Sequence, residues 1–255
     1  MKVTVVVVGN MGTAIIKGLL RSKHDEVAGM NPTNPRVSAF AKEAGFPLYR
    51  TAEEVISQHP DVVILTTPAA ITISIVKGFT SLGRQTVIIS AAAGIKIADI
   101  KAILPDNPVA AIIPNTPVAV GAGTIGLALA NDLPAPAYDQ VTHVLSQLGD
   151  LVPVNEDQLS IVGVVGGCGP AFVDVFMDAL GDAAVKYGLD RSTAYQLIAS
   201  MVKGSGTLAA QSKLTPSQLR DQVTSPSGTT IRGVEALEKA GFRYAVIDAV
   251  NKANQ

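Results

Sequence analysis

Short β-branched runs alternate with amphipathic helical patterns through residues 1–154. Strands are expected at Val3–Val8, Glu26–Met30, Asp61–Thr66, Thr86–Ala91, Val109–Ile113 and Gly123–Ala130. Helical patterns between them include Thr13–Arg21, Val37–Ala44 and Ile97–Ile103. Repetition of strand, helix and strand is typical of an α/β fold with helices on both faces of one sheet. The sequence therefore predicts a parallel, doubly wound sheet of the Rossmann type.

The pattern changes after Pro153. Residues 155–255 are rich in Ala and Leu and read as helices, with breaks at Gly188, at Thr215-Pro216 and at Ser225–Gly228. We predict a second, all-helical domain over 155–255. A helical domain of this size buries its apolar faces poorly alone, and its small residues permit close helix contacts, so we expect a homodimer built through it. The same small residues could instead pack only within the chain; they are Gly181, Ala183, Ala184, Gly204, Gly206, Ala209 and Ala210.

Composition excludes several classes of partner. The 255 residues carry a formal net charge of −1 and no basic run, which argues against nucleic acid. Cys168 is the only cysteine, so no intrachain disulfide or multi-cysteine metal site is expected, and a reducing cytoplasm fits. No segment was expected to approach the ~18 uninterrupted apolar residues of a membrane span. We therefore expect a soluble cytoplasmic protein with no metal and no membrane partner.

A glycine-containing turn follows the first expected strand. In Gly9-Asn10-Met11-Gly12, Gly9 would let the backbone approach a pyrophosphate, and Gly12 would let the helix pack on the strand. The full G-x-G-x-x-G pattern is missing because Val7 stands at its first glycine. Valine fits a sharp turn there only if its φ stays negative.

The residues after the second strand bear on the choice of cofactor. The segment 30–36 holds no carboxylate that would repel a 2′-phosphate, whereas Asn31, Thr33, Asn34 and Arg36 could all donate to one. Asn34-Pro35 also looks like a helix cap and first helical residue. The pattern favours NADPH, with NADH possible. The alternative is an ordinary helix start with a solvated arginine.

Ligands bind at the carboxyl ends of strands in open α/β sheets. Three further segments are expected there: Thr66-Thr67-Pro68, Ala92-Ala93-Gly94 and Pro114–Pro117. Thr66, Thr67, Pro68, Ala93, Gly94 and Asn115 are therefore candidate cofactor contacts. The Asn115 amide could reach the nicotinamide ribose or carboxamide, or could only brace its turn.

The segment Val223–Thr230 precedes the helical run Ile231–Ala240. Ser227 or Thr229 could cap that helix, whose first turn offers free N–H groups and the positive end of its dipole to a small carboxylate. Thr230 would place a hydroxyl beside the anion. An ordinary capped loop is the alternative. The chain shows no histidine or lysine arranged as a catalytic acid or base, which suits imine reduction better than alcohol oxidation.

Together these segments make the chain resemble the pyrroline-5-carboxylate reductase family along its whole length. The resemblance is carried by Val223–Thr230, Gly167–Phe172, Pro114–Pro117 and Gly241–Arg243. It implies an N-terminal Rossmann domain, an interlocked helical dimer with larger rings in some members, and NAD(P)H-dependent reduction of 1-pyrroline-5-carboxylate to L-proline, the final step of proline biosynthesis. The cyclic imino acid would bind between the domains. Its ring nitrogen would lie near Thr230, the expected catalytic residue, and its carboxylate at Ser225, Ser227, Gly228 and Thr229.

The chain departs from the family pattern at Val7, Thr67, Ser160, Gly163, Cys168 and Ser227. Three alternatives therefore stay open: an enzyme like the β-hydroxyacid dehydrogenases, a reductase of another imine, and a non-catalytic NADP-binding paralogue. A lysine and asparagine pair on the helix after Gly169 would favour the dehydrogenase, but that helix starts Ala171-Phe172-Val173-Asp174.

Overall fold

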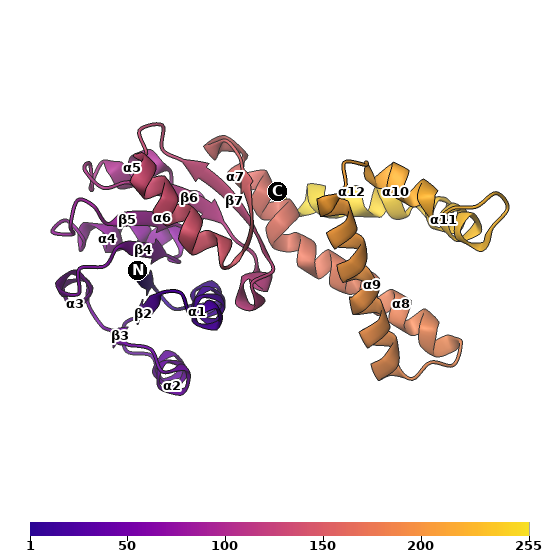
Figure 1. Ribbon diagram of the computed structural model, residues 1–255, viewed down its shortest axis with the longest axis horizontal. Coiled ribbons are helices and arrows are strands. Elements are labelled where there is room, and N and C mark those ends of the chain that lie inside the picture. Colours follow the sequence, from indigo (N-terminus) through magenta and orange to yellow (C-terminus); the bar gives the residue numbers. More distant parts are fainter. Residues whose placement is uncertain (255) are drawn as a thin grey trace. The chain divides into compact units, whose positions relative to one another are not determined.

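The computed structural model describes residues 1–254. The chain falls into two compact units, one spanning Met1–Cys168 and one that begins at Gly169 (Figure 1). The first unit is an α/β domain, and the second is entirely helical. The fold class predicted from the sequence is confirmed.

One eight-stranded sheet forms the centre of the first unit. Its strand order is β3-β2-β1-β4-β5-β6-β7-β8, and every neighbouring pair is parallel except β6 with β7. The strands are β1 (Lys2–Val6), β2 (Glu26–Met30), β3 (Leu48–Tyr49), β4 (Val62–Leu65), β5 (Val87–Ser90), β6 (Val109–Ile113), β7 (Gly123–Leu129) and β8 (Gly149–Pro153).

The expectation of a fully parallel sheet is therefore wrong at one place. Only a short 3₁₀ helix, η1 (Thr116–Val120), connects β6 to β7. A parallel crossover needs a dozen residues or more, so the chain returns antiparallel. Strands β3 and β8 lay outside the predicted set. The first has only two residues, and the second is poorly buried, so neither gives a clear apolar pattern.

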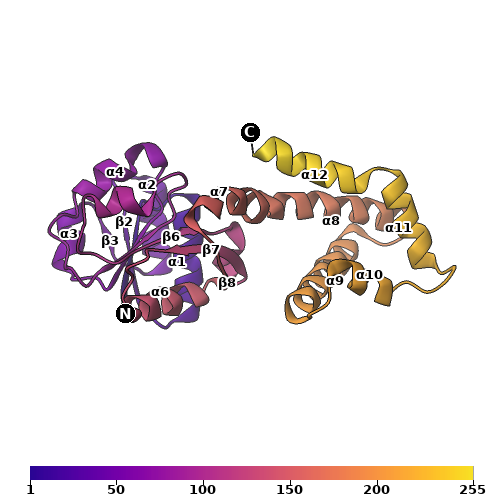
Figure 2. The same ribbon diagram turned by 90° about the horizontal axis from the view of Figure 1, so that it is seen from above.

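Helices cover both faces of the sheet, as alternation along the strands requires (Figure 2). Val3 and Val5 of β1 belong to the apolar core that also holds residues of α1, α2 and α6, while Val6 belongs to the core with α3, α4 and α5. These helices are α1 (Asn10–Ser22), α2 (Pro35–Ala44), α3 (Ala52–Ser57), α4 (Ala69–Lys77), α5 (Ile97–Lys101) and α6 (Ala135–Ser146). The sheet is thus buried on both sides, which fixes the edge where its parallel strands end.

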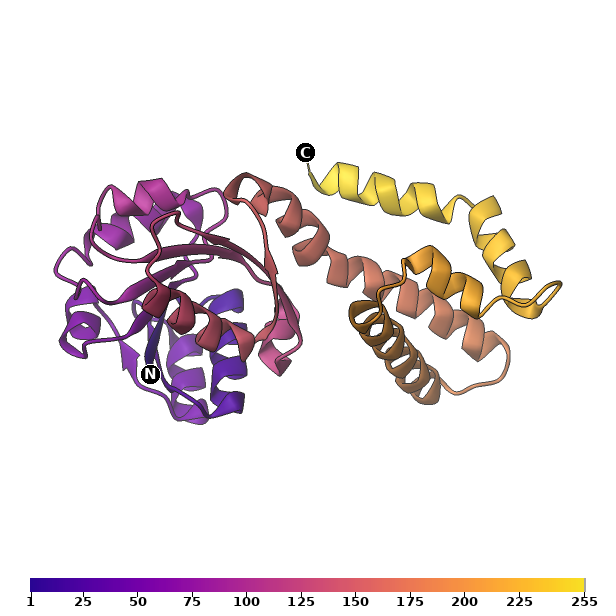
Figure 3. The same ribbon diagram turned by 45° about the horizontal axis from the view of Figure 1, so that its top comes forward.

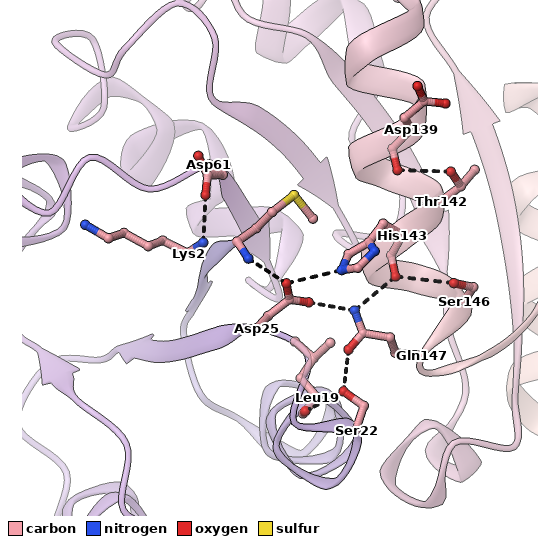
Figure 4. A network of polar contacts seen from close by, with 11 residues as sticks. Lys2, Leu19, Ser22, Asp25, Asp61, Asp139, Thr142, His143, Ser146 and Gln147 are labelled. Atoms are coloured by element: carbon pink, nitrogen blue, oxygen red, sulfur yellow. Dashed lines mark hydrogen bonds and ion pairs between the residues drawn. The ribbon is translucent and has the colours of Figure 1, made fainter.

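A buried carboxylate links the start of the sheet to α6 (Figure 4). Asp25 accepts hydrogen bonds from the Met1 ammonium at 2.8 Å and from Gln147 Nε2 at 2.6 Å, and His143 Nε2 lies 3.3 Å away. Burial of the Asp25 side chain opposes its ionisation, but these hydrogen bonds outweigh that effect and hold its pKa below the usual value. The ionised form of Asp25 therefore stabilises the fold.

Between Gly169 and residue 254 the second unit has five helices: α8 (Gly169–Lys186), α9 (Arg191–Gln211), α10 (Pro216–Gln222), α11 (Thr229–Lys239) and α12 (Phe242–Ala253) (Figure 3). Helices α8 and α9 pack as an antiparallel hairpin, in which Tyr195 Oη donates to Asp178 at 2.5 Å. A side chain at Gly181 would come within 2.6 Å of the Tyr195 ring. Gly181 therefore serves packing within the chain, which the sequence left open as the alternative to a dimer contact.

This unit has almost no interior of its own. Among its residues up to 254, only Gly181, Ala194 and Ile198 are buried. Helices α8, α11 and α12 line an apolar groove of about 670 Å³ whose lining residues are Phe172, Val175, Phe176, Ala179, Leu180, Leu237, Phe242, Ala245, Val246 and Ala249.

The helical residues 156–186 are also more apolar than the sequence analysis expected. This stretch comprises η2 (Glu156–Gln158), α7 (Leu159–Val162), the π-helix η3 (Gly163–Cys168) and α8. An 18-residue window within this stretch has a mean hydropathy of 1.8, and 6% of that window is buried, so by length and composition alone the helix could cross a membrane. The same composition also suits a helix that is covered by another protein surface.

Candidate functional site

The turn after β1 has an unusual backbone. Val7 adopts a φ of 65°, so the expectation that its φ stays negative is wrong. Three hydrogen bonds hold this residue: its N–H donates to Met30 O at 2.8 Å, and its carbonyl accepts from Gly9 N at 2.9 Å and from Thr66 Oγ1 at 2.7 Å. A left-handed conformation is costly for a β-branched residue and persists only where the surroundings impose it. The fold thus imposes on valine the conformation that suits glycine.

The two glycines of this turn serve different purposes. A Cβ at Gly12 would lie 2.7 Å from Thr66 Oγ1 and 2.9 Å from Val7 O, so only glycine lets α1 pack against the strands. A Cβ at Gly9 would meet nothing within 4 Å. Gly9 is the N-cap of α1 and provides no side-chain cap, so the N–H groups of Asn10 and Met11 remain for an anion. The turn fits a pyrophosphate.

Asn31 and Asn34 shape the loop between β2 and α2. Asn31 is 8% exposed; its Oδ1 accepts from Val8 N at 2.9 Å and its Nδ2 donates to Pro32 O at 2.9 Å. Asn34 caps α2 by accepting from Arg36 N at 3.0 Å, with Pro35 as the first helical residue. The predicted helix start is confirmed. Asn31 binds the β1 turn to this loop, so most of its amide is used within the protein.

The exposed side of this loop carries donors and no acid. Arg36 extends toward the glycine-containing turn, and its Nη1 donates to Asn10 Oδ1 at 3.3 Å. Thr33 is exposed, and the chain has no Asp or Glu between Glu26 and Glu43. This donor set fits a cofactor with a 2′-phosphate.

Arg50 is a further cation at this edge that the sequence pattern did not single out. It follows β3 as Asn31 follows β2, because Tyr49 pairs with Met30 in parallel register. Its Nη1 donates to Asn31 O at 3.2 Å and to Pro32 O at 3.4 Å, and its Nη2 donates to Ser38 Oγ at 2.9 Å. No motif marks an arginine at this distance along the chain, so its position emerges only from strand pairing.

The threonines at the end of β4 are engaged inside the protein. Thr66 Oγ1 donates to Val7 O, and Thr67 Oγ1 shares a 2.6 Å hydrogen bond with Thr72 Oγ1. Pro68 is the N-cap of α4. Thr67 is buried, so at this departure from the family pattern the chain has a neutral pair of hydroxyls that are hydrogen-bonded to each other. These residues shape the wall of the site rather than offer a charge.

A cavity of about 390 Å³ opens at the carboxyl ends of β5 and β6. Ala93 and Gly94 line it, together with Ser160 and Gly163, two of the departures from the family pattern. Glu156 also lines it and accepts from Ile97 N at 2.5 Å, which closes one side. Gly94 has a φ of 80°, so its backbone turns sharply at the cavity mouth. The cavity thus brings together four residues singled out from the sequence, two that follow β5 and two from α7 and η3.

Asn115 lies after β6 and is buried. Its Nδ2 donates to Gly166 O at 3.0 Å and its Oδ1 accepts from Thr124 N at 2.9 Å. Of the two alternatives raised by the sequence, this geometry corresponds to bracing of the turn. The amide has one N–H left for a ligand.

In the second unit, the loop before α11 presents an uncapped helix end. Gly228 is the N-cap of α11, and no side chain caps it, so the expectation that Ser227 or Thr229 is the cap is wrong. No acidic residue lies in the first turn, and Thr229 and Thr230 are exposed. The Thr224 hydroxyl instead donates to Arg220 O at 2.5 Å, at the preceding helix end. The first-turn N–H groups are therefore open to an anion.

Ser227 is the second departure from the family pattern, after Val7, that has a left-handed backbone. Its φ is 58°, and the N–H of Gly228 donates to Ser225 O at 3.0 Å, which closes the turn. The Ser227 side chain is exposed. Serine therefore holds a left-handed conformation that glycine adopts without strain.

The structure gathers the first-unit candidates along one edge of the sheet, because β1, β2, β4 and β5 are mutually parallel and end there. The loop Ser225–Thr230 forms a separate group in the second unit. Among residues 1–254, no three His, Cys, Asp or Glu side chains come together as a metal site.

Two sequence families match this chain. Residues 156–255 match the family described as pyrroline-5-carboxylate reductase dimerisation, and residues 2–94 match the one described as NADP oxidoreductase, coenzyme F420-dependent. The pyrroline-5-carboxylate reductase of Escherichia coli strain K12 is 33% identical over 250 residues, covering 96% of this chain and 92% of the relative. The chain belongs to the pyrroline-5-carboxylate reductase family.

Other relatives and solved structures agree. The reductase of Treponema pallidum is also 33% identical, over 253 residues that cover 96% of this chain and 95% of the relative. The crystal structure of Plasmodium falciparum pyrroline carboxylate reductase with NADP bound superposes with a TM-score of 0.84 at 26% identity, covering 100% of this chain and 95% of the other. A Streptomyces aurantiacus imine reductase reaches a TM-score of 0.56 at 20% identity over 99% of this chain and 94% of the other, which shows a shared fold alone.

Proposed function

We infer that this chain is an NADPH-dependent reductase that converts 1-pyrroline-5-carboxylate to L-proline. The observation that carries this inference is the match to family members of the same activity at 33% identity over nearly the full length of both chains. The alternatives are an enzyme like the β-hydroxyacid dehydrogenases, a reductase of another imine and a non-catalytic NADP-binding paralogue.

The residues at the sheet edge would hold the cofactor by charge and backbone donors. Gly9, Asn10, Met11 and Gly12 would contact the pyrophosphate through the open N-terminus of α1. Thr33 and Arg36 would face the 2′-phosphate, with Asn31 fixing their loop. Thr66, Thr67, Pro68, Ala93, Gly94 and Asn115 would shape the nicotinamide end. When bound, NADPH would supply hydride to the imine carbon.

The start of α11 would hold the substrate. Its free N–H groups and positive dipole end favour a carboxylate, which would contact Ser225, Ser227, Gly228 and Thr229. The exposed Thr230 hydroxyl would hydrogen-bond to the ring nitrogen and orient the imine. The nitrogen can arrive protonated from water, so orientation and proximity supply the rate and no strong side-chain acid is needed.

The apolar groove of α8, α11 and α12 supports assembly of two copies through the second unit, with larger rings as an extension. The family matched by residues 156–255 is described by its dimerisation, and the groove leaves Val175 72% exposed in a single chain. Covering this surface would also account for the apolar residues 156–186 in a cytoplasmic protein that touches neither membrane nor nucleic acid. In this proposal residues 1–154 bind the cofactor, and residues 155–255 bind substrate and the partner copy.

The test is oxidation of NADPH and of NADH by purified protein with 1-pyrroline-5-carboxylate, with proline quantified as the product. We expect stoichiometric proline and a higher kcat/KM with NADPH. Protein that binds NADPH yet forms no proline contradicts the proposal and favours a different imine or a non-catalytic role. A faster reaction with NADH contradicts the cofactor assignment alone.

A further inference from the structure

Arg50 carries a charge that the protein does not neutralise. The ion pairs among residues 1–254 do not include it, and its side chain contacts are to neutral groups: the carbonyls of Asn31 and Pro32 and the hydroxyl of Ser38. Glu54 accepts from the backbone N–H of Arg50 at 2.6 Å rather than from its guanidinium. A partly exposed guanidinium with no carboxylate partner keeps N–H donors that an anion can fill.

The position of this cation matches the candidate site for the 2′-phosphate. Arg50 follows β3 at the carboxyl edge of the sheet, next to the segment that follows β2. Its two carbonyl contacts belong to the first residues of the loop 31–36, and Ser38 in turn donates to Asn34 O at 3.0 Å. The guanidinium therefore holds both ends of that loop, while its five N–H donors exceed the three protein acceptors it contacts.

We propose that Arg50 is a specificity-determining residue for the 2′-phosphate of the cofactor. It orders the loop 31–36 through the Asn31 and Pro32 carbonyls and adds a second positive charge to that of Arg36. An enzyme with Arg50 therefore discriminates in favour of the phosphorylated ribose, and this discrimination is electrostatic. The inference rests on the proposed cofactor site but not on the identity of the imine.

Two nucleotides that differ only at the 2′ position test this directly: adenosine 2′,5′-bisphosphate and adenosine 5′-monophosphate. Their dissociation constants are measured by titration calorimetry on the full chain and on the Arg50→Gln variant. Loss of a charge-assisted contact predicts about 10- to 100-fold weaker binding of the bisphosphate, with the monophosphate changed less than about 2-fold. The preference of the wild type for the bisphosphate should also fall as salt rises, and that dependence should be weaker in the variant.

Arg84→Gln is the matched control, because Arg84 is exposed and pairs only with Asp106 at 3.3 Å, so the net charge changes equally without touching the loop. This variant should leave the dissociation constants of both nucleotides unchanged. If Arg50→Gln weakens binding of both nucleotides equally, Arg50 only braces the loop, and the proposal is overturned. No change in the binding of either nucleotide overturns it as well.

If Arg50→Gln fails to fold, Arg50→Lys serves, since it keeps the charge and loses the planar fork. It should weaken the bisphosphate selectively but less, by about 3- to 10-fold. Equal weakening of both nucleotides by Arg50→Lys overturns the proposal here too. Because these measurements need no imine, a wild type that binds the bisphosphate through Arg50 but makes no proline refutes the proposed reaction and leaves this inference intact.

Discussion

Replacing Val7 by glycine and by alanine should give an unusual order of stability. In ordinary backbone, alanine is more stable than glycine by about 0.5–1 kcal/mol, because glycine loses more chain entropy on folding. Val7 has a φ of 65°, where every residue with a Cβ is strained. We therefore expect Val7→Gly to be more stable than Val7→Ala.

The magnitude follows from three contributions. Release of left-handed strain on going to glycine contributes about 1–3 kcal/mol. The added entropy of glycine in the unfolded chain costs about 0.5–1 kcal/mol. The half-buried Val7 side chain packs on the core of α3, α4 and α5, and its loss costs about 1 kcal/mol. The free energy of unfolding of Val7→Gly should thus lie within about 1 kcal/mol of that of the wild type. That of Val7→Ala should be about 1 kcal/mol lower than that of Val7→Gly.

The assay is equilibrium unfolding in urea, with both variants and the wild type measured at one temperature. Val8 provides the control, because it is adjacent and buried but is not among the residues with positive φ. Val8→Ala should be more stable than Val8→Gly by about 0.5–1 kcal/mol, the ordinary order. If Val7→Ala equals or exceeds Val7→Gly, the left-handed conformation is not costly there and the argument fails.

Three further outcomes are expected. Thr230→Ala should lower kcat/KM by about 10- to 1000-fold with unchanged folding, and unaltered imine kinetics would exclude its role. Asp25→Asn should lower the free energy of unfolding by about 1–3 kcal/mol near neutral pH. Because folding lowers the pKa of Asp25, this loss of stability relative to the wild type should persist above about pH 4 and vanish as pH falls through the folded pKa. A loss that stays constant in urea titrations down to about pH 2 would refute the linkage. Val246→Asp in the groove should give monomers by light scattering. Val120→Asp is the control, because Val120 is exposed in the first unit, and it should remain dimeric. If both variants are monomeric, or both dimeric, the groove is not the interface.

Local signals predicted much of the fold and of the cofactor edge. The alternation of buried runs and helices gave β2 and β6 with their observed bounds. The Asn34-Pro35 pair predicted the start of α2, because a cap and a first-turn proline act on their own neighbours. Gly12 was predicted from its spacing after a strand, and the close approach of Thr66 explains it. These features depend on residues within one turn or one strand.

The remaining features depend on contacts between distant segments. Strand β7 pairs antiparallel with β6 because the connection between them is short and because that edge of the sheet is free. Neither condition can be read from the residues of β7 itself. Arg50 reaches the loop after β2 only because the two-residue β3 pairs there. The open end of α11 could not be predicted because serine and threonine normally cap helices, yet here Gly228 holds that position.

Val7 and Ser227 have left-handed backbones in the two turns that face the proposed anions, but their conformations have different origins. At Val7 the turn is fixed by hydrogen bonds to Met30 of β2 and to Thr66, which follows β4, so the fold maintains it whatever residue is present. At Ser227 the turn is closed by a contact between Gly228 and Ser225 within the same loop. Glycine at residue 7 should therefore alter stability and leave the cofactor turn in place. At residue 227 the hydrogen bond that closes the turn lies within the loop itself, so glycine relaxes the turn and changes how well the carboxylate site is ordered before substrate binds.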